Sequence, residues 1–222
     1  MPSLLDLLLP PACAVCGAAG PLLCQGCLLA MPLLREPLCG RCGRPTATPV
    51  PDCRECRGRK LGFATARAAV AHHDAGAGLV HRLKQGGLRG LAEPAAALIA
   101  FAVPAPEVEA VCWVPADRWR LIARGENPPE LIAAALARRW GLPARSLLDV
   151  CRARRPQRGL GVGERRANVR GAFRATGTSP RAVCLVDDVL TTGATLSACA
   201  GELRRAGAER VEAVTLARVV RL

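Results

Sequence analysis

The sequence predicts an α/β protein, in which a parallel sheet with flanking helices is preceded by a small N-terminal cysteine-rich module. Past Lys60, short apolar runs of strand length alternate with longer runs of helical periodicity. Eight of the 12 cysteines lie in the first 56 residues. A chain of 222 residues, half of them hydrophobic, can form one sizeable core and one small extra module. We therefore expect two domains, residues 1–60 and 61–222.

The expected strands and helices alternate along the second domain. Strand character is found at 63–73, 110–117, 181–189 and 210–220, and helical character at 78–87, 91–103, 127–141 and 194–208. The helix at 127–141 has the clearest ends, with Asn127 as N-cap, Pro128 in the first turn and Gly141 as the stop. In an open parallel sheet, ligands bind at the carboxyl ends of the strands.

The N-terminal cysteines are spaced as zinc ligands. They form four C-x-x-C pairs, namely Cys13 and Cys16, Cys24 and Cys27, Cys39 and Cys42, and Cys53 and Cys56. This spacing lets two thiolates reach one tetrahedral ion from a single turn. We expect a double zinc-ribbon module with two structural Zn²⁺ sites, grouped as consecutive pairs or in an interleaved order. An iron–sulfur cluster is the alternative.

The chain is strongly basic, and its basic residues are concentrated. Lys and Arg total 31 against 18 acidic residues, a net charge of +13. Residues 112–174 hold 14 Arg and 5 acidic residues, which indicates a polyanionic ligand, either nucleic acid or a phosphorylated small molecule. A general arginine bias of the chain is the alternative explanation. The first residues lack a basic leader and a membrane-length apolar run, so we expect a cytoplasmic protein that does not bind membranes.

The segment "VDDVLTTGAT" combines an acidic pair with a hydroxyl-rich turn around a glycine. Asp187 and Asp188 come at the carboxyl end of an expected strand, and the turn leads into the next helix. A helix N-terminus suits a phosphate, and Gly193 lets the backbone approach it closely. The carboxylates can accept hydrogen bonds from sugar hydroxyls, and a nearby cation would offset their repulsion. The segment therefore predicts a sugar phosphate ligand.

These motifs resemble a known family. "VCLVDDVLTTGAT" is similar to the phosphoribosyl-pyrophosphate (PRPP) loop of type I phosphoribosyltransferases. Most of the chain resembles the ComF family, whose members join a double zinc ribbon to a phosphoribosyltransferase-like domain and are associated with DNA uptake in competence. The other matching pieces are the four cysteine pairs, "RLKQGG", "VPADRWRLIARGEN" and "RRPQRGLGVGERRANVRGAF". The resemblance implies a type I phosphoribosyltransferase-like sheet after the zinc-ribbon module.

The resemblance also implies roles for individual residues. Asp187 and Asp188 would bind the ribose hydroxyls as the catalytic pair. The PRPP-binding residues would be Thr191, Thr192, Gly193, Ala194 and Thr195 at the 5′-phosphate, Pro115, Ala116, Asp117 and Arg118 near the diphosphate, and Arg158 and Arg165 on a segment that closes over the site. The sequence departs from the family at "RGENPP", where members carry an aromatic residue and a Gln after Arg-Gly.

Three functions follow as expectations. The first is a phosphoribosyltransferase that uses Mg²⁺ with PRPP and transfers the sugar to an unknown acceptor, displacing pyrophosphate. The second is a catalytically weak PRPP-binding regulator or scaffold, whose zinc module contacts the helicase-like DNA-uptake protein that the resemblance implies. The third is a nucleic-acid-binding protein with a vestigial phosphate loop. The low aromatic content, 3% of residues, disfavours the third, because single-strand binding surfaces stack bases on aromatic side chains.

Overall fold

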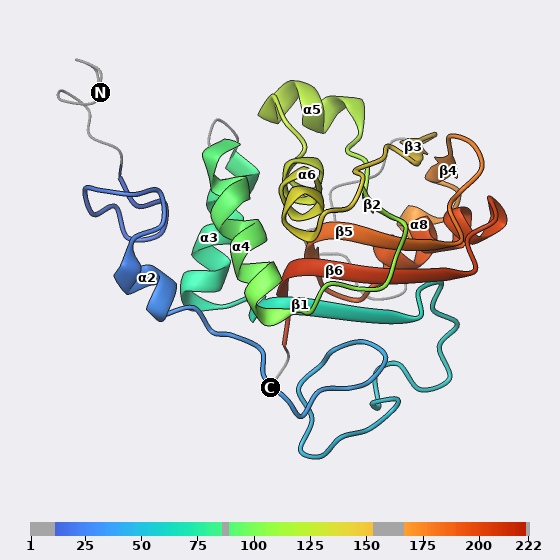
Figure 1. The fold of residues 1–222 in the computed structure, drawn as a ribbon, viewed down its shortest axis with the longest axis horizontal. Helices are drawn as coiled ribbons and strands as arrows, with labels where there is room; N and C mark the ends of the chain where they lie inside the picture. The colour runs from blue at the N-terminus through green and yellow to red at the C-terminus, as the bar shows by residue number, and fades with distance from the viewer. Residues whose placement is uncertain (1–11, 86–88, 153–166, 221–222) are drawn as a thin grey trace.

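A computed structural model describes residues 12–85, 89–152 and 167–220. Its centre is a four-stranded sheet in the order β1-β6-β5-β2, and all of its neighbouring strands run parallel (Figure 1). The strands are β1 (Thr65–Ala71), β2 (Ala110–Trp113), β5 (Ala182–Leu190) and β6 (Arg210–Arg218). Because the strands are parallel, their carboxyl ends share one edge, and the loops that leave this edge lie close together.

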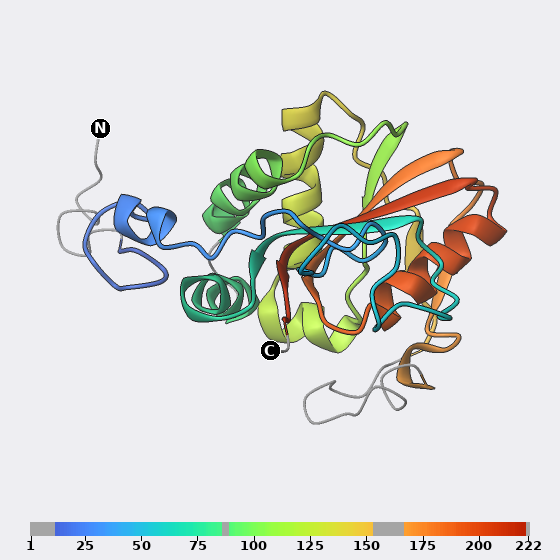
Figure 2. The same cartoon turned by 90° about the horizontal axis from the view of Figure 1, so that it is seen from below.

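Helices cover both faces of this sheet. The helices of the sheet domain are α3 (Asp74–Gln85), α4 (Ala92–Ala102), α5 (Arg118–Arg124), α6 (Pro128–Trp140) and α8 (Ala194–Arg205), with a 3-10 turn, η1 (Arg89–Leu91), before α4. One buried core joins α3, α4 and α6 to side chains such as Cys184 and Val186 of β5. A second core joins α8 to Val183 and Leu185 on the opposite face (Figure 2). Adjacent residues of β5 therefore point into different cores, as strand geometry requires.

A small two-stranded antiparallel sheet adds to the α8 side of the molecule. It consists of β3 (Leu148–Val150) and β4 (Phe173–Ala175), and it packs beside α8. The sequence did not predict this sheet or α5, because their elements are too short to show a clear period. The predicted fold class is nevertheless confirmed, since the structure has the parallel sheet, the flanking helices and the N-terminal cysteine module. In the described residues, no helix has the length and apolar character needed to span a membrane.

Helix α3 begins earlier than the sequence predicted. The expected start was residue 78, because the glycines at 76 and 78 are poor helix formers. In the structure α3 starts at Asp74, and Gly76 lies against the end of β1. A Cβ atom at Gly76 would lie 2.4 Å from the carbonyl oxygen of Ala71. Tertiary packing, and not helix propensity, therefore explains this glycine.

The two cysteine clusters pack at different places on the domain (Figure 1). The first cluster, with helix α2 (Gln25–Leu29), lies beside α3 and α4, where Val15, Leu22 and Leu23 pack against the first core. The second cluster lies along β1, where the Ala66 N–H donates to the carbonyl oxygen of Arg41 at 2.7 Å. The domain boundary between residues 60 and 61 stays a prediction.

The linker after the second cluster passes close to α8, and this contact can be tested. A Cβ at Gly62 would lie 2.5 Å from the Ser197 carbonyl oxygen and 2.9 Å from the Gly201 nitrogen. Both atoms are backbone, so we expect Gly62→Ala to destabilise the protein by about 1–3 kcal/mol. Gly201→Ala is the matched control, because Gly201 is on α8 and a Cβ there would face open space. This variant should be neutral or slightly stabilising. Thermal unfolding of both variants measures the difference, and equal melting temperatures would contradict the tight contact.

Candidate functional site

The carboxyl edge of the sheet brings two of the sequence-predicted loops together. Strands β2 and β5 are direct neighbours, and the Val114 N–H continues their ladder by donating to the Val186 carbonyl oxygen at 2.9 Å. The segment after β2, which contains the predicted residues Pro115 to Arg118, therefore starts beside Asp187. Candidate residues that are far apart in the sequence thus lie at one edge because of the strand order.

The acidic pair lies within β5, and its two side chains diverge. Asp187 is on the same face as Leu185, toward α8, and Asp188 is on the face of Val186, toward α3. The Asp187 Oδ1 atom accepts from the Asp188 N–H at 2.8 Å. The Asp188 Oδ2 atom pairs with Lys84 Nζ on α3 at 3.2 Å. The alternation of the strand and the lysine reduce the repulsion between neighbouring carboxylates.

Lys84 is a candidate site residue for which the sequence alone predicted no role. Its segment "RLKQGG" is one of the motifs that resemble the family, and this resemblance is the feature of the sequence that could have indicated Lys84. His72, after the end of β1, is a second neighbour of this group. Burial lowers the pKa of His72, Lys84 lowers it further, and Asp188 offsets part of the effect. The His72 ring is therefore neutral at physiological pH, so Lys84 is the cation that balances Asp188.

The turn between β5 and α8 has the form expected of an anion-binding loop. Gly193 is the N-cap of α8 with φ 73°, a left-handed conformation that favours glycine, and it has no side chain of its own to cap the helix. The Thr192 Oγ1 accepts from the Ala194 N–H at 3.4 Å. Thr191, Thr192 and Thr195 are half-buried, and Gly193 and Ala194 are buried. The helix N-terminus presents N–H groups and a partial positive charge to this loop.

The loop after β2 is ordered by polar contacts from the start of α6. Asn127 is the N-cap of α6, as predicted, but its side chain makes no cap hydrogen bond. Its Nδ2 donates instead to the Val114 carbonyl oxygen at 3.2 Å. Asp117 is buried in this loop, whereas Arg118 is exposed at the start of α5. Asn127 therefore connects α6 to the strand end that precedes the predicted diphosphate loop.

The departure from the family pattern at "RGENPP" has a structural explanation. Glu126 is buried, and its Oε2 atom pairs with Arg89 Nε at 3.3 Å. A buried carboxylate is stable only with such a partner. Glu126 thus connects the turn before α6 to η1. The predicted residues Arg158 and Arg165 lie outside the described part of the chain.

The eight N-terminal cysteines form two separate tetrads in consecutive order. Cys13, Cys16, Cys24 and Cys27 make the first, and Cys39, Cys42, Cys53 and Cys56 make the second, with the sulfurs of each tetrad within 4.8 Å of one another. One sulfur–sulfur distance in the first tetrad is 3.7 Å, and three in the second are 3.6 to 3.7 Å. Four thiolates around Zn²⁺ at about 2.3 Å stand about 3.8 Å apart. Both tetrads fit Zn²⁺, and the interleaved grouping is excluded.

One thiol in each tetrad has a lowered pKa, which favours the thiolate that binds a metal ion. Burial raises the pKa of Cys13, but backbone N–H donors from Cys24, Cys16 and Val15 outweigh burial and lower it to about 6. A similar balance lowers the pKa of Cys39 to about 6. Burial raises the pKa of Cys27 to about 12. Metal binding must therefore displace protons from other thiols, and zinc affinity should weaken as the pH falls.

The second tetrad is bound to the sheet by a buried arginine. Arg218, at the carboxyl end of β6, is 3% exposed. Its Nη1 donates to the Cys42 carbonyl oxygen at 2.7 Å, and its Nη2 lies 3.5 Å from the Cys42 sulfur and 3.6 Å from Glu55 Oε2. A buried guanidinium requires compensating acceptors and negative charge. Thiolates of the metal site supply such charge beside it.

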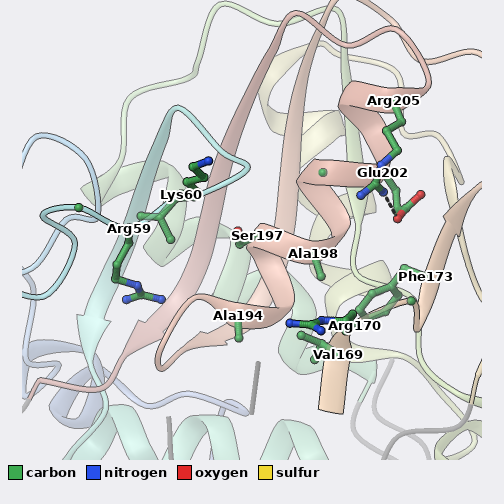
Figure 3. Close-up of a pocket in the computed structure, with 14 residues that line it drawn as sticks. Arg59, Lys60, Val169, Arg170, Phe173, Ala194, Ser197, Ala198, Glu202 and Arg205 are labelled. Carbon is green, nitrogen blue, oxygen red and sulfur yellow. Dashed lines mark hydrogen bonds and ion pairs between the residues drawn. The ribbon is translucent and has the colours of Figure 1, made fainter. Parts of the chain in front are cut away.

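A cavity of about 460 Å³ runs along the outer side of α8 (Figure 3). Its walls come from the linker at Arg59 and Lys60, from the outer face of α8, and from the segment that contains Arg170 and Phe173. Of the predicted site residues, Ala194 lines it. The cavity thus begins at the N-terminus of α8 and extends away from the acidic pair.

Comparisons with known proteins found a matching family, a curated relative and a similar solved structure. The family described as "Double zinc ribbon domain" matches residues 4–57. The chain is 35% identical over 115 residues to competence protein F of Haemophilus influenzae, a match that covers 50% of each chain. This chain thus spans about half the length of that relative. A solved structure of the glutamine PRPP amidotransferase from B. subtilis, complexed with ADP and GMP, is similar at a TM-score of 0.38 and 23% identity, over 57% of this chain and 25% of that one.

The tetrads predict two zinc ions per chain. We expect metal analysis of the purified protein to find two Zn²⁺ ions, and one after either Cys16→Ser or Cys56→Ser, because three thiolates hold the ion much less well than four. Cys151→Ser, an exposed cysteine outside the tetrads, is the control and should keep both ions. Iron with inorganic sulfide in the wild-type protein would contradict the assignment.

Proposed function

We propose that this chain, which joins two cysteine tetrads to a parallel α/β sheet, is a ComF-like protein and that it binds PRPP at the carboxyl edge of the sheet. The observation that carries the proposal is the arrangement at the end of β5. There an acidic pair is followed by a short turn into a helix N-terminus whose N-cap is a left-handed glycine. Carboxylates suit the sugar hydroxyls, and the helix N-terminus suits the 5′-phosphate.

The two carboxylates have different parts in this proposal. Asp187 points to the α8 side of the sheet, where the phosphate loop lies, so it would bind the ribose hydroxyls directly. Asp188 is paired with Lys84, so it would bind through its remaining acceptor capacity and would orient the lysine. Lys84 also brings a positive charge to an edge where a diphosphate would bind. The segment from Pro115 to Arg118 would contact that diphosphate.

Mg²⁺ fits this site only together with PRPP. Among the described residues, the clusters with at least three metal-ligating groups are the two cysteine tetrads, whose sulfurs do not suit Mg²⁺. Mg²⁺ commonly binds through one or two carboxylates plus phosphate oxygens of the substrate. Asp187 and Asp188 are the carboxylates available for this role. When bound, the ion would neutralise charge on the departing diphosphate.

The proposed reaction is transfer of the phosphoribosyl group to an unidentified acceptor, with pyrophosphate as the leaving group. A second candidate function is a PRPP-dependent regulator or scaffold in DNA uptake, with little turnover and a helicase-like partner. The similarity to competence protein F favours keeping this candidate. Pyrophosphate release from Mg-PRPP, followed against a panel of acceptors, distinguishes the two. Because zinc thiolate sites require reduced cysteines, both candidates are proposed for the cytoplasm.

Replacing both carboxylates tests the binding site. We expect Asp187→Asn with Asp188→Asn to abolish PRPP binding, because the amides neither balance Lys84 nor hold Mg²⁺. The variant should stay folded, since both side chains are at the edge of the sheet. Asp149→Asn, an exposed carboxylate on β3, is the matched control. Titration calorimetry with Mg-PRPP measures the affinities, and unchanged affinity in the double variant would refute the assignment.

The arginine-rich segment separates PRPP binding from nucleic-acid binding. Replacing both Arg158 and Arg165 with Ala should weaken PRPP binding and leave DNA binding at physiological salt largely unchanged. A diphosphate held by a few arginines should also show a shallower salt dependence than DNA, whose binding releases many counterions. Arg204→Ala, an exposed arginine on α8, is the control. Loss of DNA binding with normal PRPP affinity would instead assign the segment to nucleic acid.

A further inference from the structure

The linker between the second cysteine tetrad and β1 contacts the proposed phosphate loop, residues 191–195, on two sides. Arg59 Nη2 donates to the carbonyl oxygen of Thr192 at 2.7 Å. The buried ring of Phe63 lies next to Gly193, where an added Cβ would be 3.4 Å from its Cζ atom. Between these residues, the Gly62 N–H donates to Ser197 Oγ at 2.9 Å. Three consecutive contacts thus join residues 59–63 to the loop and the first turns of α8.

The contact from Arg59 sets the orientation of a peptide unit in the loop. A peptide bond is planar and trans, so its C=O and N–H groups point in opposite directions. When Arg59 binds the Thr192 carbonyl, the Gly193 N–H must point away from the linker. The positive guanidinium also polarises this amide and strengthens its N–H as a donor. Figure 3 shows Arg59 reaching from the linker toward the turn that precedes Ala194.

Arg59 is itself held by the second tetrad. It follows the ligand Cys56 by three residues, and its backbone N–H donates to the Cys56 carbonyl oxygen at 3.0 Å. Its Nη1 also reaches the Glu55 carbonyl oxygen at 3.4 Å. The turn that carries Cys53 and Cys56 therefore determines where the guanidinium lies. On its other side, the tetrad is fixed to β6 through Arg218 and to β1 through backbone hydrogen bonds.

A cation at a helix N-terminus is unfavourable unless a negative group is present. Here the Thr192 carbonyl compensates only part of the charge of Arg59, and a phosphate bound in the loop would compensate more. The position of Arg59 is thus consistent with an anion site. We propose that Arg59 is a positioning residue for the 5′-phosphate loop and that the second zinc site controls this loop by holding Arg59. The inference deepens the PRPP-binding proposal and rests on it for its ligand.

Within the described ranges, the first tetrad has no comparable connection to the loop at 191–195. Its neighbours Val15, Leu22 and Leu23 pack on the core of α3 and α4, on the other face of the sheet from α8. The two zinc sites should therefore differ in their effect on the phosphate loop. Loss of the second site should loosen the loop, whereas loss of the first should mainly affect its own module. This asymmetry separates the inference from a general effect of zinc on stability.

Arg59→Ala tests the positioning role with two independent readouts. We expect faster hydrogen–deuterium exchange in residues 190–196 of the ligand-free protein, because the loop loses its support. We also expect PRPP affinity to fall about tenfold, the effect of losing one hydrogen bond to a charged group. Arg59→Lys should restore much of the affinity, since it keeps a charged donor. Arg57→Ala, an exposed arginine two residues away, is the matched control and should change neither readout.

Cys53→Ser against Cys16→Ser tests the zinc connection. We expect each variant to lose one zinc ion, and Cys53→Ser to increase exchange at 190–196 and weaken PRPP binding more than Cys16→Ser does. Circular dichroism checks that the sheet domain remains folded, and if Cys53→Ser unfolds it, Arg59→Ala decides. Unchanged exchange and affinity in Arg59→Ala would overturn the inference. If the wild-type protein does not bind PRPP, the proposed function fails, while the exchange experiment still decides the role of Arg59.

Discussion

The parallel pairing of β5 with both of its neighbours is the constraint on which the site depends. Because β2, β5 and β6 run in the same direction, their carboxyl ends meet at one edge. The acidic pair, the phosphate loop, the segment after β2 and the buried Arg218 all lie at or next to that edge. An antiparallel β2 would move its loop to the opposite end of the sheet. The direction of the strands thus determines which loops lie together, and the individual contacts depend on it.

Strand geometry also explains how two adjacent carboxylates are tolerated. Alternation along β5 sends Asp187 toward α8 and Asp188 toward α3, so the two charges are on different faces. Each then finds its own compensation, from a backbone N–H in one case and from Lys84 in the other. Two adjacent acidic residues in a loop, where side chains do not alternate between two faces, would lack this separation. The site therefore holds two adjacent negative charges without placing them on the same face of the strand.

The cysteine modules are integrated with the sheet to different degrees. The first uses apolar contacts with the helices, which are non-directional. The second uses directional polar contacts, including a guanidinium that is almost fully buried beside a metal-ligating sulfur. Such contacts specify geometry more than they add stability. This difference is the physical reason for treating the second tetrad as part of the functional site.

The sequence by itself determined the features that arise from local spacing and periodicity. Cysteine spacing predicted the zinc-ligand module, alternating periods predicted the α/β class, and the acidic Thr/Gly turn is the basis of the proposed phosphate loop. Tertiary structure decided which distant residues complete these motifs. Lys84 reaches Asp188 and Arg59 reaches Thr192 across more than 100 positions, and no local pattern encodes such pairs. Short elements such as α5 and the antiparallel β3–β4 pair also depended on packing, because a few residues contain too little periodicity to specify them.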